Sequence, residues 1–241
     1  MPFIDRLIDS SPCVELQRYS VQHRMDRVSR SGTKVQVFVC GRFVNRLLSF
    51  TDTARDIPAA KGKMPYTSPT VTLPDGRHIM GSEHIAPELE RLQPEPSLHV
   101  DDPMTEKATA AVGEFFGGLA PLLLPRVPKR LLNPRSAEYF EETRKGWFKM
   151  PLSELEKSQG AQEAWEKAKP GYEKIKELLQ QKKGGPFVHG EQVTYADFII
   201  VGSFEFIRLL GEDVFEKAMS IDPAFPQLYE ACKPWMKRSD H

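Results

Sequence analysis

The stretch GGPFVHGEQVTYADFIIVG, residues 184–202, contains the signal that decides how the second half of the chain folds. Thr194 is placed to cap a helix by accepting a hydrogen bond from the backbone N–H of Asp197, and the Asp197 carboxylate can reach back to the N–H of Thr194. Val193 and Phe198 occupy the positions of a hydrophobic staple, and an acid in the first turn suits the helix dipole. We therefore expect Thr194 and Asp197 to have a structural role as a helix cap.

The rest of the second half is also typical of helices. Helical spacing predicts helices over residues 105–124, 136–147, 152–159, 161–181 and 195–210. Ala108, Ala111 and Gly118 give the first of them a face of small residues. The segment PRVPKRLLNP, residues 125–134, reads as a connection interrupted by prolines.

The first half alternates between strand and helix patterns. Strands are predicted at residues 3–8, 34–40, 70–73 and 77–80, and helices begin near Ser11 and at Ser82. Pro74-Asp75-Gly76 is predicted to form a hairpin turn, because proline presets φ and glycine tolerates a positive φ. The order of elements is that of a thioredoxin-like domain, so the predicted fold class is α/β plus all-α. The predicted units are a thioredoxin-like domain at 1–93, a proline-containing linker at 94–103 and an all-helical domain at 104–241.

Charge and cysteine content exclude several classes of protein. Lysine plus arginine and aspartate plus glutamate number 33 each, and this balance argues against nucleic acid as the main partner. Cys13, Cys40 and Cys232 are far apart and contain no CxxC pair, so neither a disulfide framework nor a zinc site is expected. The chain shows no signal-peptide pattern and no membrane-spanning apolar run, which predicts a cytoplasmic protein.

Several stretches taken together resemble the glutathione S-transferase superfamily. Residues 184–202 are similar to the buried helix of its C-terminal domain, and residues 64–92 resemble the second half of its thioredoxin-like domain. Residues 123–144 and 230–241 look like a fungal subgroup, some members of which serve secondary-metabolite biosynthesis. The resemblance begins near residue 56, and residues 1–55 diverge from the family pattern.

The resemblance implies a glutathione site in the first domain. In the family, the proline that matches Pro69 is cis, and the backbone of the residue matching Ser68 pairs with glutathione like an added strand. The serine that matches Ser82 binds the γ-glutamyl carboxylate at a helix N-terminus, although a cap alone would also explain a serine there. The family usually has an acid where this chain has Gly81, which weakens the expected contact with the ligand amino group.

The sequence does not decide which residue would activate the glutathione thiol. A hydroxyl or a helix-terminal N–H stabilises a thiolate, and Ser10 and Ser11 stand at the start of the first predicted helix. Cys13 is an alternative that would itself form a mixed disulfide. Each of these residues also has a purely structural interpretation, as a cap or a packed side chain.

Tyr139, Phe140 and Trp147 could line a pocket for an apolar electrophile, or they could belong to the helical core. No metal site is expected, because His84 and His189 have no partner at ligand spacing, and the strand alternation predicts that His78 faces solvent.

The preferred function is that of a glutathione transferase-like enzyme that uses the glutathione thiolate on an apolar small molecule, by conjugation or by addition and elimination. Glutathione is the expected co-substrate, and a homodimer without nucleic-acid or membrane partners is the expected state. One alternative is a catalytically degenerate member that binds ligands or scaffolds a partner. Another is a thiol-disulfide oxidoreductase that uses Cys13.

Overall fold

The described part of the first half is a small antiparallel sheet followed by a helix. The structure is a computed structural model that describes residues 36–38, 70–72, 77–92, 94–132, 134–182 and 184–236. The first elements are β1 (Gln36–Phe38), β2 (Thr70–Thr72), β3 (His78–Met80) and α4 (Ser82–Leu92). The strands lie in the order β1-β2-β3, and Val71 of the central strand is opposite Val37 on one side and Ile79 on the other.

These three strands lie within predicted strand segments, and α4 begins at the predicted residue. The strand predicted at 3–8 and the helix predicted near Ser11 lie outside the described residues. The thioredoxin-like arrangement of the first half, and the domain boundaries at 93 and 103, therefore stay predictions. The Glu95–Pro96 peptide bond, in the predicted linker, is cis.

Helix α4 contacts β2 and β3, and one of its carboxylates binds the residue before β3. Ile85 and Leu89 are four residues apart and each is 1% exposed. The Glu88 carboxylate accepts hydrogen bonds from Arg77, which lies just before β3, and from Arg91 in the last turn of α4.

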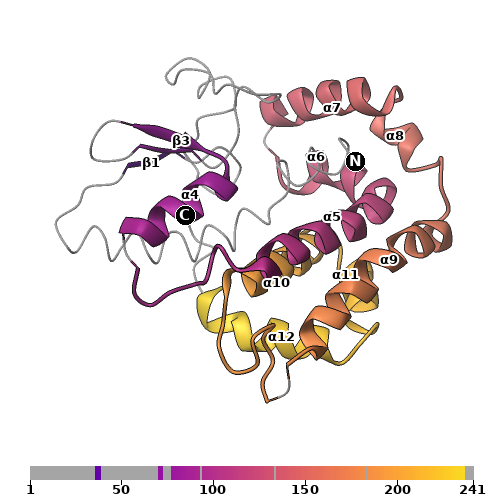
Figure 1. Cartoon of the computed structure of the whole chain (residues 1–241). Coiled ribbons are helices and arrows are strands. Elements are labelled where there is room, and N and C mark those ends of the chain that lie inside the picture. Colours follow the sequence, from indigo (N-terminus) through magenta and orange to yellow (C-terminus); the bar gives the residue numbers. More distant parts are fainter. Residues whose placement is uncertain are drawn as a thin grey trace.

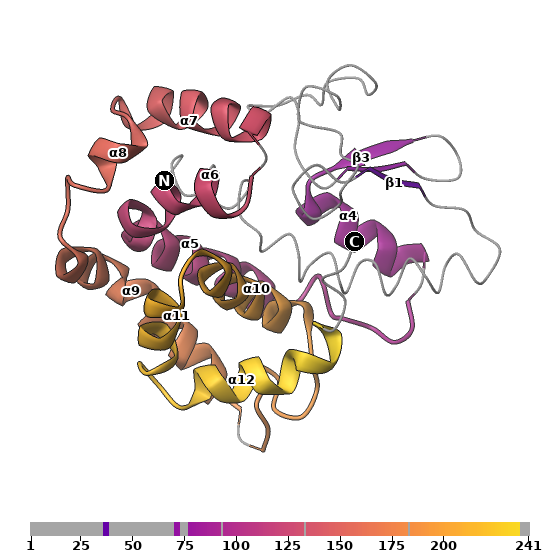
Figure 2. The ribbon, with the colours of Figure 1, turned by 180° about the vertical axis from the view of Figure 1, so that it is seen from behind.

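The second half is helical, as predicted. Its elements are α5 (Pro103–Leu123), η1 (Leu124–Arg126), α6 (Val127–Arg130), α7 (Pro134–Phe148), α8 (Leu152–Leu155), α9 (Ala161–Gln180), α10 (Tyr195–Leu210), α11 (Glu212–Met219), α12 (Ala224–Cys232) and η2 (Lys233–Trp235). The strands and α4 lie at one side of the molecule and the bundle from α5 to α12 at the other, in the views of both Figure 1 and Figure 2.

Helices α5 and α9 make the most extensive contact of any two described elements. A side chain at Gly118 of α5 would collide with the backbone of Ala168 in α9, and one at Gly171 of α9 would collide with the backbone of Phe115 in α5. The helix axes can approach this closely only because both positions lack a Cβ. The small-residue face predicted for the first helix of the bundle thus lies against α9.

Helix α10 is the central element of the core. Phe198, Ile200, Phe204 and Ile207 are all at most 1% exposed. A helix that is apolar on every side is stable only when other elements surround it, and α5, α6, α11 and α12 all contact α10. Its bounds, Tyr195–Leu210, coincide with the predicted ones.

The segment at 125–134 is more regular than predicted. Pro125 and Pro128 stand in the first turns of η1 and α6, where a proline has no hydrogen bond to lose. The prolines therefore start short helices here instead of preventing them. Helices α11 and α12 were not predicted.

Among the residues that the structure describes, one helical segment, Pro103–Arg130, is long and apolar enough to cross a membrane by length and composition. Of its most apolar window, 72% is buried inside the protein. The apolar residues of this segment are therefore accounted for by the core of the bundle.

Candidate functional site

The junction between β3 and α4 presents the predicted ligand residues Gly81 and Ser82 at a helix N-terminus. Gly81 has φ +88°, and its carbonyl accepts hydrogen bonds from the N–H groups of His84 and Ile85 at 3.1 and 3.0 Å. Ser82 is half-buried, and no hydrogen bond of its hydroxyl is found to any residue that the structure describes. A hydroxyl beside the first N–H groups of an 11-residue helix is a suitable environment for a carboxylate.

The backbone at position 81 favours glycine. A φ of +88° is strained for any residue with a side chain. A Cβ at position 81 would also lie 2.7 Å from Oε2 of Glu83, whose carboxylate folds back over the glycine. An acidic group is therefore present at this helix start, two residues later than the family pattern places it.

The other predicted ligand and catalytic residues lie outside the described part of the chain. These are Ser68 and Pro69, predicted to contact glutathione, and Ser10, Ser11 and Cys13, predicted to activate the thiol. Their roles, and the distance between Pro69 and Ser82, stay predictions.

The predicted aromatic wall on α7 is organised around a residue that sequence reasoning missed. Tyr139 is 40% exposed, whereas Phe140 is only 6% exposed. Phe140 and Trp147 hold the guanidinium of Arg144 between them, with their ring centroids 4.0 and 4.1 Å from its central carbon. Two of the three aromatic residues predicted to line a pocket thus stack on a cation.

Arg144 is a buried charge. Arg144 is only 4% exposed, and burial lowers the pKa of its guanidinium to about 10. The only sequence signal for this arrangement is the spacing of an aromatic residue four positions before and another three positions after the arginine, which places all three on one helix face.

Thr194 and Asp197 form the capping box at the start of α10. Oδ2 of Asp197 accepts from the backbone N–H and from the hydroxyl of Thr194, and Oδ1 accepts from the N–H of Val188 at 2.7 Å. Burial raises the pKa of Asp197, although these three hydrogen bonds oppose the shift. The carboxylate is fully occupied with holding the chain before α10, so it has no free atom for chemistry.

Cys232 and His189, in the described part of the chain, also have structural surroundings. Cys232 is fully buried, and burial raises the pKa of its thiol well above the ordinary value, which keeps it protonated. The two ring nitrogens of His189 lie 2.8 Å from Nζ of Lys182 and 3.1 Å from Oδ2 of Asp102. Among the described residues no group of His, Cys, Asp and Glu could hold a metal ion.

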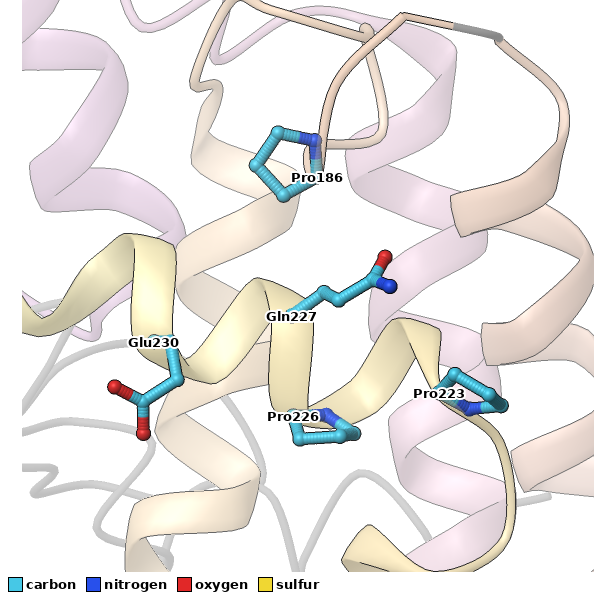
Figure 3. Close-up of a pocket in the computed structure, with 5 residues that line it drawn as sticks. All are labelled: Pro186, Pro223, Pro226, Gln227 and Glu230. Carbon is cyan, nitrogen blue, oxygen red and sulfur yellow. The ribbon is translucent and has the colours of Figure 1, made fainter.

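A shallow groove of about 650 Å³ lies between α12 and the loop before α10 (Figure 3). It is lined by Pro186, Pro223 and Pro226 together with Gln227 and Glu230. The one charged residue, Glu230, is paired with Lys233 at 2.6 Å. The groove thus offers shape and apolar surface but no group that could carry a reaction.

Comparison with known proteins identifies the fold and the family. Residues 108–235, more than half of the chain, match the family of glutathione S-transferase C-terminal domains. A glutathione S-transferase-like protein of Aspergillus flavus, ustS, is 28% identical over 197 residues, which are 75% of this chain and 71% of that protein.

Solved structures share the fold at lower identity. A glutathione S-transferase of Ceriporiopsis subvermispora, solved in complex with glutathione, superposes with a TM-score of 0.67 at 22% sequence identity. The superposition covers 86% of this chain and 99% of that structure's chain. The glutathione transferase GSTFuA2 of Phanerochaete chrysosporium gives 0.62 at 24% identity, over 77% of this chain and 80% of its own. The chain belongs to the glutathione S-transferase family, and the relatives named here are fungal proteins.

Proposed function

We propose that this protein is a glutathione transferase-like enzyme with glutathione as its co-substrate. The observation that carries the proposal is the N-terminus of α4, where the half-buried Ser82 follows a glycine with positive φ. Family membership and the glutathione bound to a structural relative support the same interpretation. The γ-glutamyl carboxylate of glutathione would lie against Ser82 and the first N–H groups of the helix.

The second part of the proposal concerns the reaction. The glutathione thiol loses its proton, the thiolate forms a carbon–sulfur bond with an electrophilic carbon of an apolar molecule, and a leaving group departs or the adduct persists. Ser11 or Ser10 would hold the thiolate. A role in fungal secondary-metabolite biosynthesis, in a homodimeric cytoplasmic enzyme, belongs to the same proposal.

Calorimetric titration with glutathione tests the binding step. We expect the intact chain to bind glutathione and Ser82→Ala to bind about tenfold more weakly, because one hydrogen bond to a charged group is lost. Ser153, an exposed serine in α8, provides the matched control, and Ser153→Ala should bind like the unchanged protein. A folded protein that does not bind glutathione would contradict the proposal.

That outcome would favour the second candidate, a catalytically degenerate member that binds apolar ligands or a partner. The observation behind it is Gly81, where the resembled family has an acid. A third candidate, disulfide exchange through Cys13, predicts that Cys13→Ser abolishes activity while Ser11→Ala retains it. A serine-dependent transferase predicts the reverse result for the same two variants.

A further inference from the structure

Arg144 is held rigidly on α7 by its own helix. The central carbon of the guanidinium lies over the rings of both Phe140 and Trp147. Nη1 donates to the hydroxyl oxygen of Thr143 at 2.9 Å. That hydroxyl donates in turn to the carbonyl of Tyr139 at 2.8 Å, so its lone pair is directed to the arginine.

The hydrogen-bonding capacity of this guanidinium is far from satisfied. The Nε–H is buried and has no acceptor. No carboxylate of the residues that the structure describes forms an ion pair with Arg144, whereas Arg126 and Arg208 are paired with Asp213 and Glu205. Stacking attracts the cation to the rings but supplies no acceptor for the N–H groups at its edge.

A buried guanidinium without an ion-pair partner lowers the stability of the folded protein. Buried charges are normally paired, and a buried N–H without an acceptor loses its hydration without compensation. The Nε edge of an arginine matches the two oxygens of a carboxylate, and a guanidinium fixed between two rings loses little freedom when it binds one. The geometry therefore fits an anion that the protein itself does not provide.

We propose that the Nε edge of Arg144 binds the carboxylate of an apolar small molecule that lies against α7. The molecule contributes the missing acceptors, and the aromatic residues around Arg144 contact its apolar part. If the proposed transferase function holds, the acid is the second substrate. Only this identification rests on the proposed function. The co-substrate class is then an apolar carboxylic acid and not a neutral hydrocarbon.

Calorimetric titration without glutathione tests the binding proposal directly. The probes are naphthalene-2-carboxylate and the uncharged naphthalene-2-carboxamide, which has nearly the same shape. We expect the acid to bind about tenfold or more tightly than the amide, since only the acid forms charged hydrogen bonds with Arg144. Equal affinities, or no binding of either probe, would overturn the proposal.

Three variants assign the preference to Arg144. Arg144→Met should bind the two probes equally, and Arg144→Lys should lose most of the preference because it keeps the charge without the paired N–H groups. Lys145→Met removes the same charge from an exposed position on the same helix and should leave the preference unchanged. An acid preference that persists in Arg144→Met would overturn the proposal.

Thermal unfolding separates a binding role from a structural one. If Arg144 is kept for a ligand, Arg144→Met should unfold at the same temperature as the unchanged protein or higher, because an unpaired buried charge is replaced by an apolar side chain. A melting temperature lower by several degrees, with no change in probe selectivity, would show that Arg144 only stabilises α7. Glutathione titration of the same variants distinguishes failure of this inference from failure of the proposed transferase, because the transferase proposal places glutathione at Ser82 and predicts that it binds with or without Arg144.

Discussion

Oδ2 of Asp197 accepts hydrogen bonds from the backbone N–H of Thr194 at 2.7 Å and from its hydroxyl at 2.8 Å. The second carboxylate oxygen of Asp197 holds the N–H of Val188, nine residues earlier in the chain. One side chain thus fixes both the start of the buried helix α10 and the loop that leads into it.

Replacing Asp197 should therefore destabilise the whole bundle. Asp197→Ala leaves the buried N–H groups of Val188 and Thr194 without acceptors, and we expect a loss of about 2–4 kcal/mol in the free energy of unfolding. Urea denaturation followed by circular dichroism measures it. Glu212→Ala, at an exposed acid in the first turn of α11, is the control and should change stability by less than about 0.5 kcal/mol. A loss for Asp197→Ala no larger than that of the control would refute this role.

Replacing glycine by alanine should have opposite effects on stability at Gly171, which lies against α5, and at Gly146 in α7. Gly171→Ala places a methyl group against the backbone of Phe115, so the helices must separate, and we expect a loss of about 2–4 kcal/mol. Gly146, in α7, has no atom within 4 Å of an added Cβ. Gly146→Ala should be neutral or stabilise by up to about 1 kcal/mol, because alanine is the better helix former. Equal melting temperatures for the two variants would contradict the close approach of α5 and α9.

The capping box shows what could be predicted from sequence. The Thr194–Asp197 spacing and the apolar run after it define a helix from its first residue, and local signals of this kind survive in the fold. Pro125 and Pro128 misled the interpretation of their segment, because a proline disfavours the helix interior but suits the first turn. Only the tertiary packing decides which of these positions it occupies.

The site was less predictable for a physical reason. The positive φ of Gly81 follows from how β3 and α4 are joined, and no local pattern specifies it. Arg144 was missed because arginines on helices are usually solvated, and the aromatic residues on either side suggest core packing as readily as stacking on a cation. The activating residue and the contacts of Pro69 stay predictions, since they fall outside the described residues.

Glu88 should make stability depend on pH. Hydrogen bonds from Arg91 and Arg77 lower the pKa of Glu88 from 4.5 to about 2. Because the folded state prefers the ionised form, the stabilisation is complete above pH 4.5 and is lost as the pH falls toward 2. Glu88→Gln should therefore be less stable than the unchanged protein by about 1 kcal/mol near neutral pH, a value limited by solvent screening.

The measurement is the difference in unfolding free energy between the two proteins across this pH range. Other carboxylates titrate in both proteins, so their contributions cancel. The difference should shrink steadily below pH 4.5 and be lost as the pH falls through 2. A difference that stays constant over the range would show that the arginines do not stabilise the ionised carboxylate of Glu88.

Cys232 should be inert in the native protein, a result that bears on the redox alternative. It is the last residue of α12 and is fully buried, and burial raises the pKa of its thiol, so little thiolate forms near neutral pH. The variant Cys13→Ser/Cys40→Ser leaves Cys232 as the only thiol of the three in the sequence. Iodoacetamide should label this variant slowly under native conditions and rapidly after unfolding in urea, as followed by mass spectrometry. Fast labelling of the folded variant would make Cys232 an accessible nucleophile and place disulfide exchange in the helical half of the chain.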